Sequence, residues 1–500
     1  MTEFELKFEI PPRRLPAVKA AMQEAECNAQ HLQARYFDTA DGALARKGLV
    51  VRVRQEGAHW VQTAKGPTSD PLHRLEHNVA LASPPANGDF PGVDLARHAG
   101  TPVGERLTKA LGLKKGEPAP MLILLYATDV QRLTRCVSLE GSDIELALDV
   151  GSVVSGQRSI ALCELEVELK HGKPAHAAEV ARAWCKRHGL WLSVVSKSMK
   201  GQQLGSGSAW GPARSATPPQ FKRSASGAHV AVAVLQSCLA QVLSNASEVA
   251  GGSDQPEHVH QLRVGLRRLR TALRELPLLC DGINPSWTTP LVTAFRHLGA
   301  HRDHDLLALG LQHRIMTAGG PALPVPPLES SIPTPARVVR SPAFQNSLLG
   351  VISFVQATAS NLPATTRTTS KKTPEKILRK RLSTLWARAV ADGNKFLLLD
   401  DERQHSVRKR LKRLRYLTEF AAPLFHARRV TSFVAGLKPA QSALGLYNDE
   451  IMALKTYREL AFTDAQAMFG VGWLTARRAP NADNCLRALN AFAKVRPFWK

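Results

Sequence analysis

Two short stretches of the sequence place acidic side chains at every second position. They are Glu3–Lys7, which reads EFELK, and Glu164–Glu168, which reads ELEVE. Because alternate side chains of a β-strand point to the same face, each stretch predicts one charged face and one apolar face. Most charged strand faces are simply solvated. Carboxylates and a lysine on one face could also hold a divalent metal and a phosphate together.

Basic side chains alternate in the same way along other predicted strands. Strands are predicted at residues 49–54, 59–65, 72–76, 144–149, 159–162 and 162–169, and helices at 12–26, 106–111 and 175–188. The alternating basic residues are Lys7, Arg52, Arg54, Lys65, Arg74 and Arg132. Antiparallel strands joined by hairpins predict a closed or nearly closed sheet, whose interior would hold both signs of charge.

Such an interior would suit a phosphorylated ligand. Its carboxylates could coordinate Mg²⁺ or Mn²⁺ through oxygen atoms. Its arginines and lysines could bind phosphate oxygens. The alternative is the outward polar face of a sandwich, which suits a single strand better than six strands with the same alternation.

The charge of the chain is distributed unevenly. The formal net charge is +24, and residues 1–204 contain 26 Lys and Arg against 23 Asp and Glu. Residues 205–500 contain 40 against 19, so nearly all of the excess lies there. A surface of this kind attracts a polyanion such as nucleic acid, an anionic membrane or polyphosphate.

Several features indicate a cytoplasmic protein that does not insert into a membrane. The seven cysteines are scattered without a CxxC pair, which favours a reducing compartment and argues against structural zinc. Charged residues begin at Glu3, which is not typical of a signal peptide. The longest apolar runs, near Met121–Ala127 and Leu348–Val355, are too short to span a bilayer.

Residues 3–7 match the ExExK signature of the CYTH family, the triphosphate tunnel metalloenzymes. Further pieces follow in family order: YFDT at 36–39, RVR at 52–54, QTAK at 62–65, RLE at 74–76, ALDVG at 147–151, ELEVE at 164–168 and SK at 196–197. Residues 1 to about 204 therefore resemble this family. The resemblance implies an eight-stranded antiparallel tunnel that binds a triphosphate end-on and hydrolyses it with a divalent metal. Members include inorganic triphosphatases, thiamine triphosphatases and class IV adenylyl cyclases.

The resemblance also implies roles for the charged residues. The implied metal ligands are Glu3, Glu5, Glu164, Glu166 and Glu168. The implied substrate ligands are Lys7, Arg52, Arg54, Lys65, Arg74, Arg132 and Lys197. The residues expected to take part in catalysis are Glu5, Lys7, Arg52, Arg54, Lys65, Glu76 and Asp149. The sequence leaves open which glutamates of 164–168 bind the metal, and whether Arg132 or Arg135 faces the tunnel.

The composition changes near residue 205. Residues 205–227 are rich in glycine, serine and proline and predict a flexible linker. From Val230 onward, apolar residues recur with helical periodicity. Residues 260–270 (HQLRVGLRRLR) and 405–415 (HSVRKRLKRLR) align without gaps, each with a histidine followed by basic residues at offsets 3, 7, 8 and 10. This alignment predicts a duplicated helical unit.

Each repeat places a basic stripe beside an apolar stripe, which favours a shared basic groove over two solvated faces. The two basic stripes consist of His260, Arg263, Arg267, Arg270, His405, Arg408, Lys412 and Arg415. The repeats resemble the CHAD domain, an α-helical module often fused to CYTH. The resemblance covers residues 228–500, with repeats at about 228–320 and 375–500, and implies two pseudo-symmetric helical bundles that bind inorganic polyphosphate. Loops are predicted at Pro321–Pro335 and Thr365–Pro374.

The expected fold class is α+β. An eight-stranded antiparallel β tunnel with flanking helices, at residues 1–204, is followed by the linker and by an all-α domain of two repeated helical bundles at residues 228–500. The expected function is metal-dependent hydrolysis of tripolyphosphate to diphosphate and phosphate, with Mg²⁺ or Mn²⁺ as the cofactor. Long-chain inorganic polyphosphate is the expected partner of the helical domain. The expected location is the cytoplasm, where the protein could associate with polyphosphate granules.

Two alternatives to this function stay open. One is a phosphate-binding or polyphosphate-binding protein without catalytic activity, and the other is a hydrolase of thiamine triphosphate or a nucleoside triphosphate. Nucleic acid is disfavoured as a partner, because few aromatic residues accompany the basic stripes.

Overall fold

The computed structural model describes residues 2–68, 70, 72–82, 90–114, 117–322, 328–362 and 373–500. Residues 323–327, in the first predicted loop, and residues 363–372, which overlap the second at 365–372, lie outside the described residues. The chain forms two compact units. The first contains residues 1–215, 239–262 and 335–360, and the second contains residues 216–238, 263–334 and 361–500. The domain boundaries at residues 204 and 227 stay predictions.

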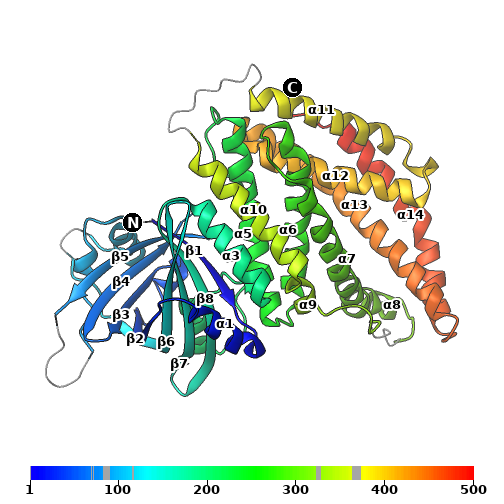
Figure 1. Ribbon diagram of the computed structural model, residues 1–500. Coiled ribbons are helices and arrows are strands. Elements are labelled where there is room, and N and C mark those ends of the chain that lie inside the picture. Colours follow the sequence, from blue (N-terminus) through cyan, green and yellow to red (C-terminus); the bar gives the residue numbers. More distant parts are fainter. Residues whose placement is uncertain are drawn as a thin grey trace. The chain divides into compact units, whose positions relative to one another are not determined.

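The first unit is built around one antiparallel sheet (Figure 1). Its strands are β1 (Thr2–Glu9), β2 (Asn28–Asp38), β3 (Val50–Glu56), β4 (His59–Pro67), β5 (His73–Leu81), β6 (Ile123–Leu139), β7 (Ser142–Ser155), β8 (Arg158–His171) and β9 (Trp191–Leu192). The strand order is β5-β4-β3-β2-β6-β7-β8-β1, and β1 also pairs with β5, so eight strands close into a barrel. The predicted eight-stranded antiparallel tunnel is confirmed. The short strand β9 pairs with the end of β1.

The alternation of apolar side chains fixes which face of β1 turns outward. Phe4, Leu6 and Phe8 are at most 3% exposed. Helix α3 (Pro174–His188) packs against β1, β7 and β8 and covers this side of the sheet. Burying three side chains of this size stabilises the fold by several kcal/mol, roughly 1.5–3 kcal/mol each. A slip of one residue would bring these apolar side chains into the tunnel, so the register of β1 is strongly specified.

Helix α4 (Lys197–Ser206) packs against β6, β7 and β8. Its N-cap is Ser196, whose hydroxyl oxygen accepts a hydrogen bond from the backbone N–H of Met199. Gly201 lies so close to Tyr126 that a Cβ atom built on the glycine would be 2.1 Å from the ring atom Cδ2. This close approach fixes where the first turn of α4, with Lys197, meets the tunnel.

The other helices complete both units. Near the barrel they are α1 (Leu15–Met22) and α2 (Pro102–Leu111). After residue 226 they are α5 (Gly227–Gly251), α6 (Pro256–Glu275), α7 (Thr288–Asp305), α8 (Gln312–Thr317), α9 (Pro335–Val339), α10 (Pro342–Ser360), α11 (Pro374–Gly393), α12 (Asp401–Ala421), α13 (Ala427–Leu460) and α14 (Ala467–Ala493). The predicted change from strands to helices after the linker is therefore confirmed.

The duplicated sequence folds as the helices α6 and α12. On α6 the apolar stripe includes Leu266 and Leu269, which are fully buried. On α12 the equivalent residues, Leu411 and Leu414, are at most 1% exposed. Both stripes thus supply core residues, as their spacing predicts.

Two details of the strand prediction were incomplete or wrong. Residues 159–162 and 162–169 were predicted as separate strands, but they form the single strand β8. The strands β2 and β6 were not among the predicted segments. β2 has 11 residues and β6 has 17 residues. Both strands mix apolar and polar residues without strict alternation over their whole lengths.

Among the described helices, α5 is long and apolar enough to cross a membrane by length and composition alone. In this structure 56% of the most apolar 18-residue segment of α5 is buried inside the protein. The core helix of a soluble protein can have the same length and composition, so this feature is weak evidence for a membrane span.

Replacing Gly201 with alanine should destabilise the protein by about 1–3 kcal/mol, the typical cost of overpacking a filled site. The new methyl group would collide with the Tyr126 ring, so α4 or the ring must move. Urea unfolding of the purified variant measures the loss. Gly205→Ala on the same helix is the control. A Cβ atom built on Gly205 would lie 3.2 Å from its nearest neighbour, the Ser155 hydroxyl oxygen. Equal stability of Gly201→Ala and the wild type would contradict this packing.

Candidate active site in the barrel tunnel

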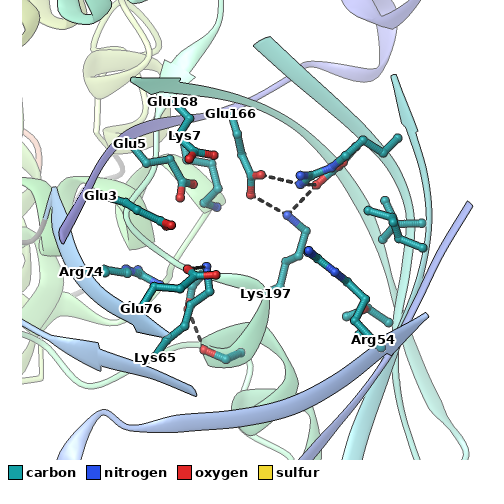
Figure 2. Close-up of a pocket in the computed structure, with 18 of the residues that line it drawn as sticks. Glu3, Glu5, Lys7, Arg54, Lys65, Arg74, Glu76, Glu166, Glu168 and Lys197 are labelled. Carbon is teal, nitrogen blue, oxygen red and sulfur yellow. Dashed lines mark hydrogen bonds and ion pairs between the residues drawn. The ribbon is translucent and has the colours of Figure 1, made fainter. Parts of the chain in front are cut away.

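The barrel encloses a charged cavity of about 420 Å³. Charged side chains reach it from β1, from β3 to β8 and from the start of α4. Figure 2 shows these acidic and basic side chains converging on one space from different strands. The convergence follows from the register, because directly paired residues of an antiparallel sheet share a face. Lys7 pairs with Glu166, Glu5 with Glu168, and Asp149 with Glu164.

Three carboxylates form a compact group on one side of the tunnel. Asp149 of β7 and Glu164 and Glu166 of β8 offer oxygen atoms that all lie within 4.8 Å of one another. Asp149 and Glu164 are completely buried. Oxygen ligands in such a group are the kind that Mg²⁺ and Mn²⁺ prefer, so the residues fit a divalent metal. We call Asp149, Glu164 and Glu166 the acidic triad.

Basic residues surround the acidic triad. Nζ of Lys197 lies 2.6 Å from an oxygen of each of its three carboxylates. Nζ of Lys7 lies 3.0 Å from Glu164 and donates to the backbone carbonyl of Val195 at 2.5 Å. Because two unpaired buried carboxylates so close together could not both stay ionised, these cations are required by the triad itself.

The positive charges near the triad lower the pKa values of two of its carboxyl groups, Glu164 and Glu166. Burial would raise the pKa of Glu164, but the charges of Lys197 and Lys7 outweigh burial and lower this pKa to about 2. Burial would also raise the pKa of Glu166. The charges of Lys197 and Arg132 outweigh burial and lower this pKa well below its usual range. Glu164 and Glu166 are therefore ionised at neutral pH.

Arg132, rather than Arg135, faces the tunnel. Its guanidinium makes a two-pronged contact with Asp149, at 2.7 Å from Nε and 2.6 Å from Nη2, and Nη2 also lies 2.5 Å from Glu166. Arg135 instead donates from Nη1 to the backbone carbonyl of Ala21 at 2.7 Å. The structure thus decides an assignment that the sequence leaves open.

A second carboxylate pair, Glu3 of β1 and Glu76 of β5, also lines the cavity. Burial raises the pKa of Glu3 to about 7, and the neighbouring Glu76, which shares a hydrogen bond with it, adds to the shift. Burial would raise the pKa of Glu76 as well, but Lys65 and Arg52 outweigh burial and lower it to about 2. Lys65 forms a short ion pair with Glu76. Glu3 is thus poised to exchange a proton near neutral pH.

The strand β3 contributes the basic wall of the tunnel. Nη1 of Arg52 lies 3.4 Å from the Tyr36 hydroxyl, and its buried Nε has no hydrogen-bond partner among the described residues. Burial lowers the pKa of Arg54, and the nearby charge of Arg52 lowers it further. Arg54 donates from Nε to Glu56 at 2.6 Å, so of these two guanidiniums it is Arg52 that has a buried nitrogen without a partner among the described residues.

Two predicted ligands differ in their surroundings from the acidic triad. Burial raises the pKa of Glu5, and Glu166 raises it further, so its carboxylate is close enough to feel the triad. Glu168 forms an ion pair with Lys170 at 2.9 Å and keeps 22% of its side chain exposed. Arg74 pairs with Glu3 in the register of β1 and β5 and also lines the cavity.

Sequence reasoning missed two residues of this site. Lys200 contacts Glu9 at 2.7 Å and Glu164 at 3.3 Å. It lies three residues after Lys197, a helical spacing that places both lysines on one face of α4 and could have indicated its role. Tyr36 was quoted only as part of a motif, although its hydroxyl contacts Arg52.

In the second unit, basic residues of α6 gather over one aromatic ring. The guanidiniums of Arg263, Arg267 and Arg270 lie 4.7, 5.8 and 5.4 Å from the centre of the Phe295 ring. The ring face attracts cations and holds these side chains side by side. Buried nitrogen atoms of the three arginines have no hydrogen-bond partner among the described residues.

The basic residues of α12 belong to the second unit as well. Burial lowers the pKa of Lys412 to about 7, and the charges of Arg267 and Arg408 add to the shift. His405 instead forms a hydrogen bond through Nδ1 with Asn448 at 2.5 Å, and Arg415 forms an ion pair with Glu419 at 2.8 Å. His260 lies in the part of α6 that belongs to the first unit.

Comparison with protein families agrees with both halves of the structure. The CYTH domain model matches residues 1–201, and the CHAD domain model matches residues 233–458. The chain therefore carries a CYTH domain followed by a CHAD domain. The resemblance inferred from the motifs is confirmed.

One relative is an inorganic triphosphatase from Haemophilus influenzae, 28% identical over 214 residues, which are 41% of this chain and 56% of that protein. This chain thus spans little more than half of the relative's length. The CHAD domain from the plant Ricinus communis is 23% identical and covers 56% of this chain and 97% of its own, with a TM-score of 0.44. A putative adenylyl cyclase from Hippeastrum, which has a dominant triphosphatase activity, is 17% identical and covers 41% of this chain and 96% of its own, with a TM-score of 0.29.

Replacing Glu164 with glutamine should destabilise the protein by about 3 kcal/mol, because it leaves buried cations without their partner. Urea unfolding in a chelating buffer measures the difference. Glu168→Gln, on the same strand but with 22% of the side chain exposed, should cost less than about 1 kcal/mol. Similar losses in the two variants would show that burial of the triad does not govern stability.

Proposed function

We propose that the tunnel hydrolyses inorganic triphosphate to diphosphate and phosphate. The observation that carries this proposal is the arrangement of charge in one cavity, with the acidic triad on one side and the guanidiniums of Arg52 and Arg54 on the other. A linear triphosphate offers anionic oxygens along its whole length, so it could contact both sides at once. The 28% identical triphosphatase supports the same substrate class.

The acidic triad would hold the metal, with Glu3 and Glu5 beside it, and Mg²⁺ or Mn²⁺ fits this donor set. When bound, the metal would neutralise phosphate charge and lower the pKa of a water molecule. Arg52, Arg54 and Lys65 would bind phosphate oxygens and stabilise the charge that builds up on them in the transition state.

In the hydrolysis, the oxygen of a water molecule forms a bond to the terminal phosphorus while the bridging P–O bond breaks. The bridging oxygen leaves on diphosphate. The proton that the water loses needs an acceptor, and Glu3, with a pKa of about 7 beside Glu76, is suited to this role. Lys7 and Arg132 would keep the acidic triad in place during the reaction.

Replacing Arg52 with methionine should lower kcat/KM for tripolyphosphate by about 10²–10³-fold, the typical loss when one donor to a developing anion is removed. Phosphate release in the presence of Mg²⁺ or Mn²⁺ measures this loss. ATP and thiamine triphosphate are tested in parallel, because hydrolysis of either in preference to tripolyphosphate would identify a different substrate.

Arg13→Met is the matched control for this experiment. Arg13 is exposed in the short 3₁₀ helix before α1, and the substitution removes the same charge. It should leave kcat/KM unchanged. Absence of phosphate release from all three substrates by the folded wild type would reject catalysis and favour a binding function.

For the helical half we propose binding of long-chain inorganic polyphosphate by the basic residues of α6 and α12. The support is the cluster of arginines over Phe295, whose buried nitrogens have no hydrogen-bond partner among the described residues. The flexible chain of phosphates needs many cations and no base-specific contacts. We also propose that the protein is located in the cytoplasm, where it could bind polyphosphate.

Removing four of these charges should weaken polyphosphate binding at least about tenfold, since each lost contact removes on the order of 0.5–1 kcal/mol. The substitutions are Arg263→Gln, Arg267→Gln, Arg408→Gln and Lys412→Gln. Binding is measured by titration calorimetry and should also weaken with added salt. Because Lys412 loses its proton near pH 7, the affinity of the wild type should fall between pH 6 and pH 8.

A charge-matched control replaces four exposed arginines elsewhere in the helical half. The control substitutions are Arg428→Gln, Arg429→Gln, Arg458→Gln and Arg487→Gln. These should change the affinity far less. Equal losses in the two quadruple variants would mean that net charge, rather than the cluster, attracts the polyanion.

A further inference from the structure

Lys197 lies at the position where the acidic triad would bind a cation. Its Nζ atom is 2.6 Å from Asp149 Oδ2, from Glu164 Oε1 and from Glu166 Oε1. Figure 2 shows the side chain extending from its helix toward Glu166. A metal such as Mg²⁺ binds carboxylate oxygens at about 2.0–2.1 Å. A cation that contacts the same three carboxylates would therefore come within a few ångströms of the ammonium, and the two like charges would repel each other strongly.

The other lysines near the triad are held differently. Lys7 is anchored by the backbone carbonyl of Val195 in addition to Glu164. Lys200 is shared between Glu9 at 2.7 Å and Glu164 at 3.3 Å. Lys197 has ion-pair contacts with all three members of the triad. It is thus the lysine that a metal at the triad would compete with most directly.

Lys197 is also able to move without unfolding its surroundings. It is the first residue of α4, directly after the cap Ser196, and 13% of its side chain is exposed to the tunnel. A lysine carries its charge on a flexible four-carbon stem, so the ammonium can shift by several ångströms while the backbone stays fixed. The cavity that it lines also contains Arg52 and Arg54, the basic wall proposed to receive phosphate.

We propose that Lys197 is an internal counter-ion that the metal displaces, and that the released ammonium then binds the triphosphate. This inference deepens the proposed function and rests on it. In the protein without metal, Lys197 neutralises the triad and is unavailable to phosphate. Metal binding frees one positive charge in the tunnel, so metal and triphosphate each strengthen the binding of the other. Coupling of this kind is reciprocal by thermodynamic necessity.

The first test measures the affinity of the full-length protein for Mn²⁺ without phosphate, from the signal of free Mn²⁺ in electron paramagnetic resonance. Lys197→Met should bind Mn²⁺ about tenfold or more tightly than the wild type, within the 5–150-fold range typical of coupling between sites. Lys197→Gln is a second neutral variant in case the first does not fold. Lys197→Arg keeps the charge and should show no tightening.

Lys200→Met is the matched control for loss of a lysine beside Glu164. Because Lys200 contacts neither Asp149 nor Glu166 in the ion pairs of this structure, its loss should change Mn²⁺ affinity much less. Thermal unfolding adds a second readout. Without metal, Lys197→Met should melt below the wild type, and saturating Mn²⁺ should raise its midpoint by more than it raises that of the wild type.

The second test measures binding of imidotriphosphate, a triphosphate with nitrogen bridges that resists hydrolysis, by titration calorimetry with and without Mn²⁺. In the wild type Mn²⁺ should strengthen this binding. In Lys197→Met the strengthening should shrink about tenfold, because the released ammonium is missing.

The outcomes separate this inference from the proposed function. Equal Mn²⁺ affinity in the wild type and in Lys197→Met would overturn the inference while leaving metal-dependent hydrolysis intact. Strengthening by Mn²⁺ that is the same in both proteins would overturn the second step, release of the ammonium to phosphate. Absence of Mn²⁺ binding in every variant would overturn both the inference and the assigned metal site, and phosphate release then shows whether hydrolysis itself survives.

Discussion

The tunnel depends on one electrostatic constraint, which is that buried carboxylates must be neutralised. Asp149 and Glu164 have no contact with solvent, and an unpaired charge at such a depth costs several kcal/mol. The barrel meets this constraint by bringing cations from distant parts of the sequence. Arg132 comes from β6, and Lys197 and Lys200 come from α4. The position of α4 is therefore part of the electrostatics of the tunnel as well as of its packing.

The same constraint divides the tunnel into two chemically different sides. The cations beside Glu164 lower its pKa to about 2, whereas burial and the neighbouring Glu76 raise the pKa of Glu3 to about 7. Environment thus gives carboxylates of the same type separate roles. Arg54 is paired with Glu56, whereas the buried Nε of Arg52 has no hydrogen-bond partner among the described residues. A polyanion with a bound metal would complete both sides.

The helical half handles charge in the opposite way. There, arginines crowd together over the Phe295 ring, and burial together with like charges lowers the pKa of Lys412 to about 7. Such a cluster stores unfavourable electrostatic energy that an anion would relieve. The carboxylates of the acidic triad are paired with neighbouring cations, whereas the three arginines over Phe295 have buried nitrogens without a hydrogen-bond partner among the described residues.

The sequence by itself determined the fold class and most of the charged residues that line the cavity, because strict alternation at residues 3–7 and 164–168 fixes which side chains share a face. The duplicated helices were predicted equally well from their spacing, whereas β2 and β6 do not alternate strictly over their whole lengths and were missed. Only the tertiary structure decided that Arg132 rather than Arg135 faces the tunnel, and that Asp149 joins Glu164 and Glu166 while Glu168 pairs with Lys170. These choices depend on which strands become neighbours when the barrel closes and on where α4 places its lysines. Such distances between remote residues are set by packing and leave no trace in local spacing.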